Sequence, residues 1–355
     1  MRKVERIDPV TVDTLRLRDA LASALSGGPA VALTALPHEK VGENVALLIE
    51  TGGSTGAPKI VALSASALRA SARLSNQTLG VTKGDHWSLS LPLNHIAGVN
   101  QLLRSIDNNS EPLEQGAEFI SVVPTQLYRA LRERGEQFEL LANAKKVLIG
   151  GAAVPAQLLQ EAASAGIPLV TSYGMTEMCG GCIYDGRALP GVEVKFIDGK
   201  TVALKGPMQA EGYFDDDYGT STSFVDGWFI TSDEGELSSD GKLVVHGRSD
   251  DVIISGGEKL SPNRVADLLR ENFPTSEILV MGVPDKEWGE SLRVIMTISN
   301  DHHGPMLPQI RELVAQGISK VAAPRSLLLL SELPVKANGK IDHQFLANAK
   351  ATEEI

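Results

Sequence analysis

The ten residues from Glu50 to Lys59 have the composition of a phosphate-binding loop. They read Glu-Thr-Gly-Gly-Ser-Thr-Gly-Ala-Pro-Lys and follow the apolar run 45–49, which is typical of a buried strand. Glycines allow positive φ and let backbone N–H groups approach an anion, while hydroxyls and a lysine add donors and charge. The loop predicts binding of a nucleotide phosphate. Its candidate contacts are Thr51, Gly53, Ser54, Thr55, Gly56 and Lys59.

The loop is not a Walker A sequence. That motif requires Gly, four residues and then Gly-Lys-Ser/Thr, whereas Ala57 and Pro58 separate Gly56 from Lys59 here. The spacing therefore disfavours an ATPase or GTPase of that type. Considered by itself, the stretch also fits a Gly/Ser surface loop.

Length and composition indicate a globular protein of two or more domains. The chain has 355 residues, 43% of them apolar and 22% charged. Its net charge of −11 argues against nucleic acid or an anionic membrane as the main partner. The charged start 1–9 lacks the apolar core of a secretion signal, and no run is long enough to cross a bilayer. We expect no membrane insertion and a cytoplasmic location.

The two cysteines, Cys179 and Cys182, form a C-x-x-C. A zinc site needs two further ligands at fixed spacing, and a thioredoxin-like motif opens a helix. Neither fits, because the sequence after Ile183 favours a strand and a turn. We interpret the cysteines as small residues that line a pocket.

Helical and extended patterns alternate over the first two-thirds of the chain and predict an α/β fold with a mostly parallel, helix-covered sheet. We expect strands at 30–35, 45–49, 87–93, 118–123, 146–150 and 167–172, and helices at 11–26, 64–79, from 124 and from 155.

Later segments differ from this pattern. Asp-Gly pairs at 198–199, 226–227 and 240–241 predict hairpins of a small antiparallel sheet or barrel over 183–247. Helices at 262–273 and 308–319 with strands near 277–283 and 292–298 indicate a compact α+β unit. We therefore expect a large N-terminal domain, 1–248, and a smaller, mobile C-terminal domain, 249–355.

Five further segments follow the loop in a fixed order. They are Leu91-Pro-Leu-Asn-His95-Ile-Ala-Gly, Tyr173-Gly-Met-Thr-Glu177, Thr231-Ser-Asp-Glu-Gly235, Gly247-Arg-Ser-Asp-Asp and Pro334-Val-Lys-Ala-Asn-Gly-Lys340. Each is a weak signal by itself. Together with the loop they resemble the acyl-adenylate-forming superfamily, which includes acyl- and aryl-CoA ligases, luciferases and adenylation domains of peptide synthetases.

The resemblance implies a reaction in which a carboxylate attacks the α-phosphorus of ATP and pyrophosphate leaves. The nucleophile is already ionised, so catalysis is mainly electrostatic. Lys340 matches the catalytic lysine, Glu177 the Mg²⁺ ligand and Thr176 the α-phosphate contact. The resemblance further implies ATP contacts by Tyr173 on adenine, Asp233 and Arg248 on ribose, and Gly151 and Ala152.

The same resemblance implies a second half-reaction with CoA. The C-terminal domain is expected to rotate about Asp250, replacing Lys340 by the segment Gly256, Gly257 and Lys259 for thiol attack.

The loop departs from the usual pattern at Gly52, where relatives keep a serine, which predicts weaker pyrophosphate contact. Only about 45 residues precede the loop, where the superfamily usually carries a further subdomain. A homodimer is possible.

Several strings resemble one subgroup, the compact 2-succinylbenzoate–CoA ligases of menaquinone biosynthesis. The most specific is Ser172-Tyr-Gly-Met-Thr-Glu-Met-Cys-Gly-Gly-Cys. This resemblance implies a dicarboxylate substrate, with Arg104 as a bidentate clamp and with His95 and Gly174 lining the acid pocket. Arg104 also fits a surface arginine, and His95 a packed core histidine.

Two other functions remain open on sequence grounds. The chain fits another aryl- or acyl-CoA ligase, or an adenylation domain that loads a carrier protein. It also fits a non-catalytic remnant that binds nucleotide, although the presence of Lys340, Glu177, Asp233 and Arg248 argues against this.

Overall fold

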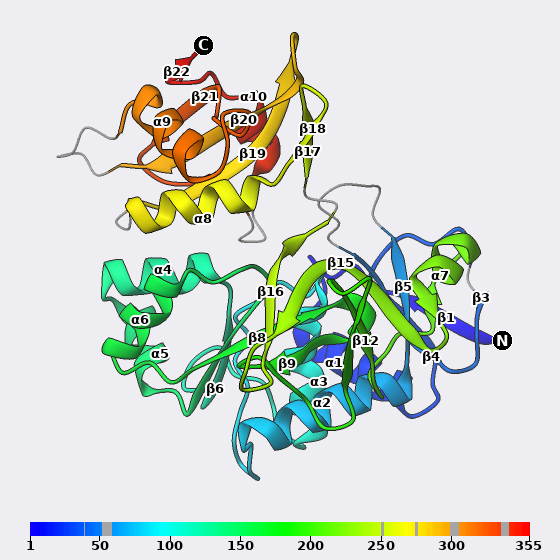
Figure 1. Cartoon of the computed structure of the whole chain (residues 1–355). Helices are drawn as coiled ribbons and strands as arrows, with labels where there is room; N and C mark the ends of the chain where they lie inside the picture. Colours follow the sequence, from blue (N-terminus) through cyan, green and yellow to red (C-terminus); the bar gives the residue numbers. More distant parts are fainter. Residues whose placement is uncertain (39, 52–58, 250–251, 274–275, 299–304, 335–340) are drawn as a thin grey trace. The chain divides into compact units, whose positions relative to one another are not determined.

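A computed structural model divides the chain into two compact units, Met1–His246 and Gly247–Ile355 (Figure 1). It describes residues 1–38, 40–51, 59–249, 252–273, 276–298, 305–334 and 341–355. Each unit has its own sheets and its own apolar core.

The first sheet of the N-terminal unit carries the ends of the predicted phosphate loop. Its strand order is β13 (Gly212–Tyr213), β5 (Ile60–Ser64), β4 (Val45–Glu50), β2 (Ala30–Ala32), β1 (Arg2–Arg6) and β3 (Lys40–Val41). The pairs β1–β2 and β2–β4 are parallel, whereas β4–β5, β5–β13 and β1–β3 are antiparallel.

Three helices, α1 (Thr14–Leu25), α2 (Ala65–Leu79) and α3 (Ile96–Asp107), pack against this sheet through the main apolar core. Local sequence sets the bounds of α2. Ser64 is its N-cap and accepts a hydrogen bond from the backbone N–H of Ala67, and Gly80 ends the helix in the left-handed conformation at φ 75°.

The second sheet places the Tyr173–Glu177 segment. Its order is β10 (Arg187–Ala188), β9 (Gly180–Tyr184), β8 (Leu169–Met175), β7 (Lys146–Ile149) and β6 (Phe119–Val122). The pairs β6–β7 and β7–β8 are parallel, and β8–β9 and β9–β10 are antiparallel. The helices α4 (Pro124–Glu133), α5 (Glu136–Asn143) and α6 (Ala156–Ser164) share an apolar cluster with β6 and β7.

The predicted α/β class is confirmed, with two corrections. Parallel pairs occupy the centre of the first sheet and one end of the second, and antiparallel strands form the rest of both sheets. The predicted strand at 87–93 is wrong: Trp87 and Ser88 form single bridges to Phe119 and Leu113, and no strand is assigned between them and α3. Pro92 lacks the N–H that a ladder requires, so the segment could not continue as a regular strand to residue 93.

A third, antiparallel sheet contains the predicted Asp-Gly hairpins. Its order is β11 (Glu193–Ile197), β12 (Thr201–Lys205), β15 (Trp228–Leu237) and β14 (Phe224–Val225), with β16 (Leu243–Arg248) also paired to β15. The pairs 198–199 and 226–227 have positive φ at both residues, as two-residue hairpins require. The short helix α7 (Asp217–Ser223) precedes β14.

The C-terminal unit is an α+β sandwich. Its sheet contains β18 (Glu258–Leu260), β17 (Ile253–Ser255), β20 (Gly289–Thr297), β21 (Ser326–Leu330) and β22 (Glu353–Glu354), with β19 (Ile278–Asp285) beside β20. The helices α8 (Pro262–Asn272) and α9 (Leu307–Gly317) share a cluster with Val294 and Met296. The alternate residue Ile295 belongs to a second cluster with Leu346 of α10 (His343–Asn348), so α10 covers the other face.

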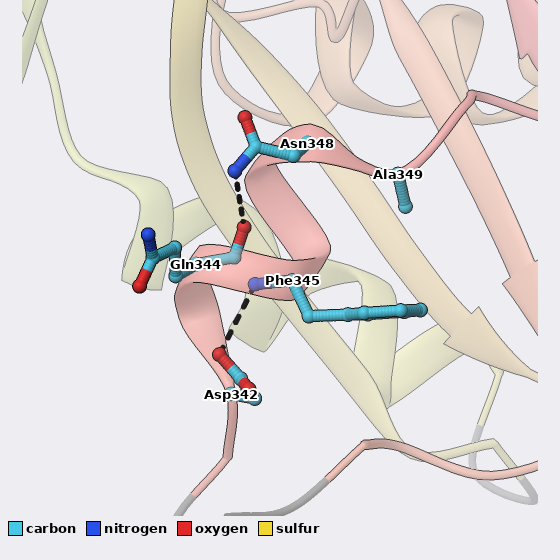
Figure 2. A pocket seen from close by; sticks show the side chains of 5 residues that line it. All are labelled: Asp342, Gln344, Phe345, Asn348 and Ala349. Atoms are coloured by element: carbon cyan, nitrogen blue, oxygen red, sulfur yellow. Dashed lines mark hydrogen bonds between the residues drawn. The ribbon is translucent and has the colours of Figure 1, made fainter.

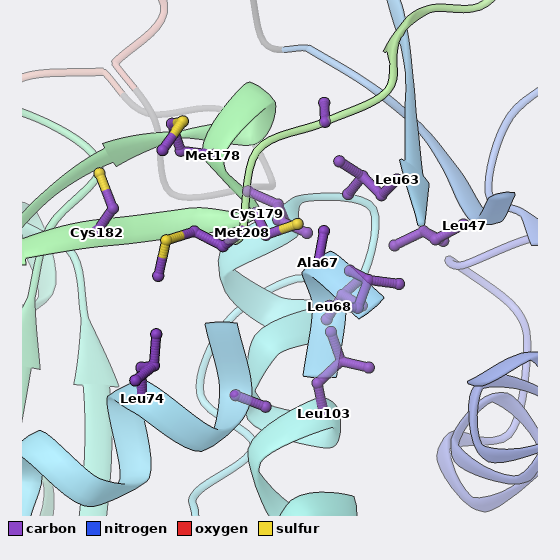
Figure 3. Close-up of a cluster of buried hydrophobic side chains, with 14 of the residues drawn as sticks. Leu47, Leu63, Ala67, Leu68, Leu74, Leu103, Met178, Cys179, Cys182 and Met208 are labelled. Carbon is purple, nitrogen blue, oxygen red and sulfur yellow. The ribbon is translucent and has the colours of Figure 1, made fainter. Parts of the chain in front are cut away.

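Both cysteines lie inside the main core rather than along a pocket. Cys179 and Cys182 are free, fully buried and surrounded by side chains such as Met178 and Met208 (Figure 3). Burial raises the pKa of Cys182 to about 12 and also raises that of Cys179. In the described part of the chain, no helix is long and apolar enough to span a membrane.

Candidate active site

The ends of the predicted phosphate loop are tied to each other. The backbone N–H of Thr51 donates to the carbonyl of Lys59 at 2.8 Å, and the backbone N–H of Lys59 donates to Thr51 Oγ1 at 3.3 Å. These bonds continue the β4–β5 pairing by one step, so the loop leaves and re-enters the sheet at one point. Gly53, Ser54, Thr55 and Gly56 lie outside the described residues, as does Gly52.

Glu177 and Thr176 lie in a single 3₁₀ turn, Thr176–Met178, directly after β8. Each is only 9% exposed. Tyr213 donates its hydroxyl to Glu177 Oε1 at 3.0 Å, and Lys59 Nζ lies 4.2 Å from the centre of the Tyr213 ring. Burial is the main cause that raises the pKa of Tyr213, and the charge of Glu177 and this hydrogen bond raise the pKa further. The hydroxyl therefore remains a donor.

Tyr213 thus connects Lys59 of the loop with Glu177 of the 3₁₀ turn. Sequence reasoning placed Lys59 and Glu177 in one site but missed Tyr213. Its segment, Gly212-Tyr213, reads only as a short turn or strand, and 36 residues separate it from Glu177. Only the pairing of β13 with β5 brings the tyrosine to the loop.

Two further predicted nucleotide contacts also lie together. Tyr173, near the end of β8, donates its hydroxyl to Asp233 Oδ2 of β15 at 2.5 Å. Asp233 is 8% exposed, and its backbone N–H donates to Thr231 Oγ1 at 2.9 Å. Burial is the main cause that raises the pKa of Tyr173, and the charge of Asp233 raises the pKa further, so the phenol stays protonated. A buried acceptor beside an aromatic ring is suited to a nucleoside.

The other predicted ATP contacts are at the surface. Gly151, with φ 85°, and Ala152 are exposed and follow β7, next to β8 in the sheet. Arg248 is exposed and is the last residue of β16. The structure therefore joins Lys59 and Glu177 through Tyr213 and pairs Tyr173 with Asp233, whereas Gly151, Ala152 and Arg248 are exposed.

Arg104 is a buried cation on α3, not a surface arginine. It is 3% exposed, and its guanidinium carbon lies 4.6 Å from the centre of the Trp87 ring. Nη1 donates to Ser121 Oγ at 3.5 Å and Nη2 to the Tyr184 hydroxyl at 3.3 Å, both neutral acceptors. Among the described residues, Nε has no hydrogen-bond partner and no carboxylate forms an ion pair with Arg104. Burying an unpaired charge is costly, so this guanidinium favours an anionic ligand.

His95 and Gly174 belong to two elements that lie close together, since α3 packs against the hairpin of β8 and β9. His95 is the N-cap residue of α3, preceded by bends and turns and not by the predicted strand. A Cβ on Gly174 would meet the carbonyl oxygen of Gly180 at 2.0 Å, so only glycine fits where β8 and β9 approach. From α3, Asn100 donates to the Cys179 carbonyl at 2.8 Å and fixes the helix against this hairpin.

In the C-terminal unit, the predicted CoA segment forms the tip of a hairpin. Gly256 and Gly257 have φ of 56° and 85° and connect β17 to β18. A Cβ on Gly256 would meet the Trp288 ring at 2.4 Å, so this glycine allows the indole to pack on the turn. Lys259 belongs to β18.

Lys340 and Asp250 lie outside the described residues. The backbone N–H of Asp342 donates to the carbonyl of Pro334 at 2.8 Å, which joins the two ends of the segment that contains Lys340. Next to this junction, α10 borders an open hollow of about 420 Å³ (Figure 2). The residues that line it are Asp342, Gln344, Phe345, Asn348 and Ala349.

No group of three or more His, Cys, Asp or Glu side chains that could hold a metal is found in the described parts of the chain. A single buried carboxylate, Glu177, fits Mg²⁺ that arrives with a nucleotide, because Mg²⁺ commonly takes one or two protein carboxylates and completes its shell with phosphate oxygens and water.

The fold and comparison with known families define the class of protein. The family model described as "AMP-binding enzyme" matches residues 3–106 and 113–214, and that of the "AMP-binding enzyme C-terminal domain" matches residues 265–340. The chain therefore belongs to the AMP-binding enzyme family, the acyl-CoA synthetase type of ligase.

Its relatives share a more specific name. A probable 2-succinylbenzoate–CoA ligase of Mycobacterium tuberculosis is 35% identical, with 98% of this chain and 92% of the relative covered. The 2-succinylbenzoate–CoA ligase of Escherichia coli is 33% identical, with 83% and 67% covered. The structure of o-succinylbenzoate CoA synthetase from Bacillus subtilis with its acyl-adenylate intermediate superposes with a TM-score of 0.73, at 25% identity, covering 99% of this chain and 84% of that one.

Proposed function

We propose that this enzyme activates 2-succinylbenzoate with ATP and transfers the acyl group to CoA, giving 2-succinylbenzoyl-CoA, AMP and pyrophosphate in menaquinone biosynthesis. The observation that carries the proposal is the 35% identity, over nearly the whole length of both chains, to a relative of that name. Other ligases of the same name cover 83% or more of this chain.

In the first half-reaction, a substrate carboxylate oxygen bonds to the α-phosphorus of ATP while the bond to the pyrophosphate oxygen breaks. The carboxylate is ionised at neutral pH, so no base is required and the site has to stabilise negative charge. We assign Lys59 and the loop to the leaving phosphates, and Thr176 to the α-phosphate. Lys340 is assigned to the reacting oxygens.

Mg²⁺ bound by Glu177 would neutralise the charge that develops on the phosphate oxygens. The Tyr173–Asp233 pair is assigned to the nucleoside. Its hydroxyl–carboxylate bond of 2.5 Å holds the ring next to Asp233, an acceptor-only group to which ribose hydroxyls can donate. Gly151, Ala152 and Arg248 are assigned to the outer part of the nucleotide.

In the second half-reaction, the CoA thiolate attacks the acyl carbon and AMP leaves. We assign the glycine hairpin at Gly256 and Gly257, with Lys259, to the CoA arm, because a turn without Cβ atoms allows a close approach. Asp250 is assigned as the hinge that exchanges this hairpin for Lys340.

Arg104 is assigned to the second, aromatic carboxylate of the substrate, with His95 and Gly174 bordering the same pocket. Its guanidinium is buried, has no carboxylate partner among the described residues and retains a free Nε donor. A planar guanidinium and a carboxylate can form two parallel hydrogen bonds. The acid would thereby supply the charge partner that the fold leaves out.

The proposal is tested by incubating the enzyme with ATP, Mg²⁺, CoA and 2-succinylbenzoate, and detecting pyrophosphate and the thioester by mass. 4-Oxo-4-phenylbutanoate, which keeps the reacting aliphatic carboxylate and lacks the aromatic one, serves as the comparison acid. Equal turnover of both acids, or transfer to a carrier thiol but not to CoA, would contradict the proposed substrate or acceptor.

Arg104→Met tests the clamp. Loss of a buried charge-assisted contact costs about 2–3 kcal/mol, so the KM for 2-succinylbenzoate should rise about 30-fold or more, while the KM for ATP stays within about twofold. Arg69→Met, an exposed arginine on α2, is the matched control. Equal increases in both KM values would refute the assignment.

ATP and CoA as substrates also favour a cytoplasmic location. A homodimer is the assembly we propose, and it is checked by sedimentation at enzyme concentrations above and below the micromolar range.

A further inference from the structure

Tyr213 contacts both charged groups that the proposed function assigns to the phosphates and Mg²⁺. Its hydroxyl donates to Glu177 Oε1 at 3.0 Å, and its ring face lies 4.2 Å from Lys59 Nζ. The tyrosine is therefore the observed link between them.

The backbone of Tyr213 is held rigidly. Its N–H donates to Thr220 Oγ1 of α7 at 2.8 Å, and Thr220 Oγ1 donates to the Tyr213 carbonyl at 3.3 Å. The preceding Gly212 has φ 140°, and a Cβ there would meet Thr220 Cγ2 at 2.5 Å. The ring of Phe224 packs edge-on against Tyr213 at 5.7 Å between centroids. A side chain fixed in this way can fix the position of others.

The two contacts act on different groups. A phenol donor to one carboxylate oxygen restricts rotation of Glu177 without neutralising its charge, so the carboxylate can still bind a cation. The ring face attracts an ammonium without neutralising it, so Lys59 keeps its charge for phosphate oxygens. A direct Lys59–Glu177 ion pair would instead satisfy both charges and compete with the ligand.

We propose that Tyr213 is a positioning residue that orients Glu177 for Mg²⁺ and keeps Lys59 apart from it, so that the metal and the phosphates bind to preset groups. This proposal rests on the proposed use of Mg²⁺ and ATP. It does not depend on which acid is activated.

The effects of the hydroxyl and the ring can be separated by two substitutions. Tyr213→Phe removes the donor and keeps the ring, so binding of ATP without Mg²⁺ should stay within about twofold, while the gain in ATP affinity from Mg²⁺ falls about tenfold, the effect expected for one hydrogen bond to a charged group. Tyr213→Leu also removes the ring, and it should weaken ATP binding both with and without Mg²⁺.

The measurement is isothermal titration of the full-length enzyme with ATP, in the presence of Mg²⁺ or of a chelator. Tyr218→Phe is the matched control, because Tyr218 lies on the neighbouring α7 and is 80% exposed. A double-mutant cycle with Glu177→Gln adds a test that a merely structural role would not pass: Tyr213→Phe should have no further effect on Mg²⁺ dependence in that background.

An unchanged Mg²⁺ dependence in Tyr213→Phe would overturn the proposal, and so would equal losses with and without Mg²⁺. An additive effect in the Glu177→Gln background would also overturn it. These outcomes are distinct from failure of the proposed function, which would show as binding of Mg²⁺ and ATP by the wild-type enzyme without activation of 2-succinylbenzoate.

Discussion

Arg293 should be the residue on which the position of α10 most depends. It lies on β20, is 7% exposed, and donates through Nε to Ser326 Oγ at 3.1 Å. Nη1 donates to three carbonyls at the end of α10, those of Leu346 at 3.1 Å, Ala347 at 3.1 Å and Ala349 at 2.8 Å. A helix of six residues is unstable without such contacts, and cations are favourable at a helix C-terminus.

We expect Arg293→Met to destabilise the C-terminal unit by about 3 kcal/mol. A hydrogen bond from a charged donor contributes about 1.5–3 kcal/mol, and four such contacts are lost. The net loss is smaller than the sum of these four contributions. The substitution also removes the cost of burying the guanidinium, and water can reach the freed carbonyls at the helix end. Arg293→Lys should recover part of the loss, since a single ammonium reaches fewer carbonyls.

The assay is hydrogen exchange followed by mass spectrometry on the full-length enzyme. The peptide that contains α10 should exchange about 100-fold faster in Arg293→Met, while a peptide from β4 keeps its wild-type rate. Arg264→Met, an exposed arginine on α8, is the control. Exchange of α10 within about twofold of the wild-type rate would refute the reasoning. Lys340 lies three residues before α10 in the sequence, so adenylation should slow more than thioester formation from supplied acyl-adenylate.

Three other predictions concern the N-terminal unit. Cys179 and Cys182 should react with a thiol reagent only after unfolding, because burial raises their pKa; rapid labelling of the native enzyme would contradict this. Although burial opposes it, hydrogen bonds from a lysine and a threonine lower the pKa of Asp85. Asp85 therefore stabilises the fold above a pH of about 4 and loses this effect as the pH falls through its folded pKa, so Asp85→Asn should flatten the acid side of the unfolding free energy against pH. Gly174→Ala should cost about 3 kcal/mol or prevent folding, whereas Gly135→Ala, where a Cβ meets nothing within 4 Å, should melt like the wild type.

Local signals in the sequence predicted many elements correctly. Ser64 and Gly80 set the ends of α2 because capping depends on neighbouring residues. The strand predicted at 87–93 was wrong, because alternating serines and leucines satisfy a strand pattern even where the chain forms only single bridges. The burial of Arg104 also could not be predicted, since it depends on the distant Trp87 and Tyr184.

At the candidate site, too, local motifs were predictable from the sequence, whereas contacts between distant residues were not. Motif spacing indicated Lys59 and Glu177, and the structure places both against one ring. The sequence motifs gave no signal for Tyr213, because a tyrosine after a glycine is common and the partners of this tyrosine are distant in the sequence. Contacts across the sheet are set by tertiary packing, which a single sequence does not contain.

The separate cores of the two units have a consequence for the history of such enzymes. In the described chain, the apolar clusters of the C-terminal unit draw only on residues from 253 onward, and the others only on residues up to 243. A crossover between genes near residue 247 would therefore split no hydrophobic cluster. Recombination at this joint could combine the N-terminal unit of one ancestor with the C-terminal unit of another, and the apolar clusters of each unit would stay intact.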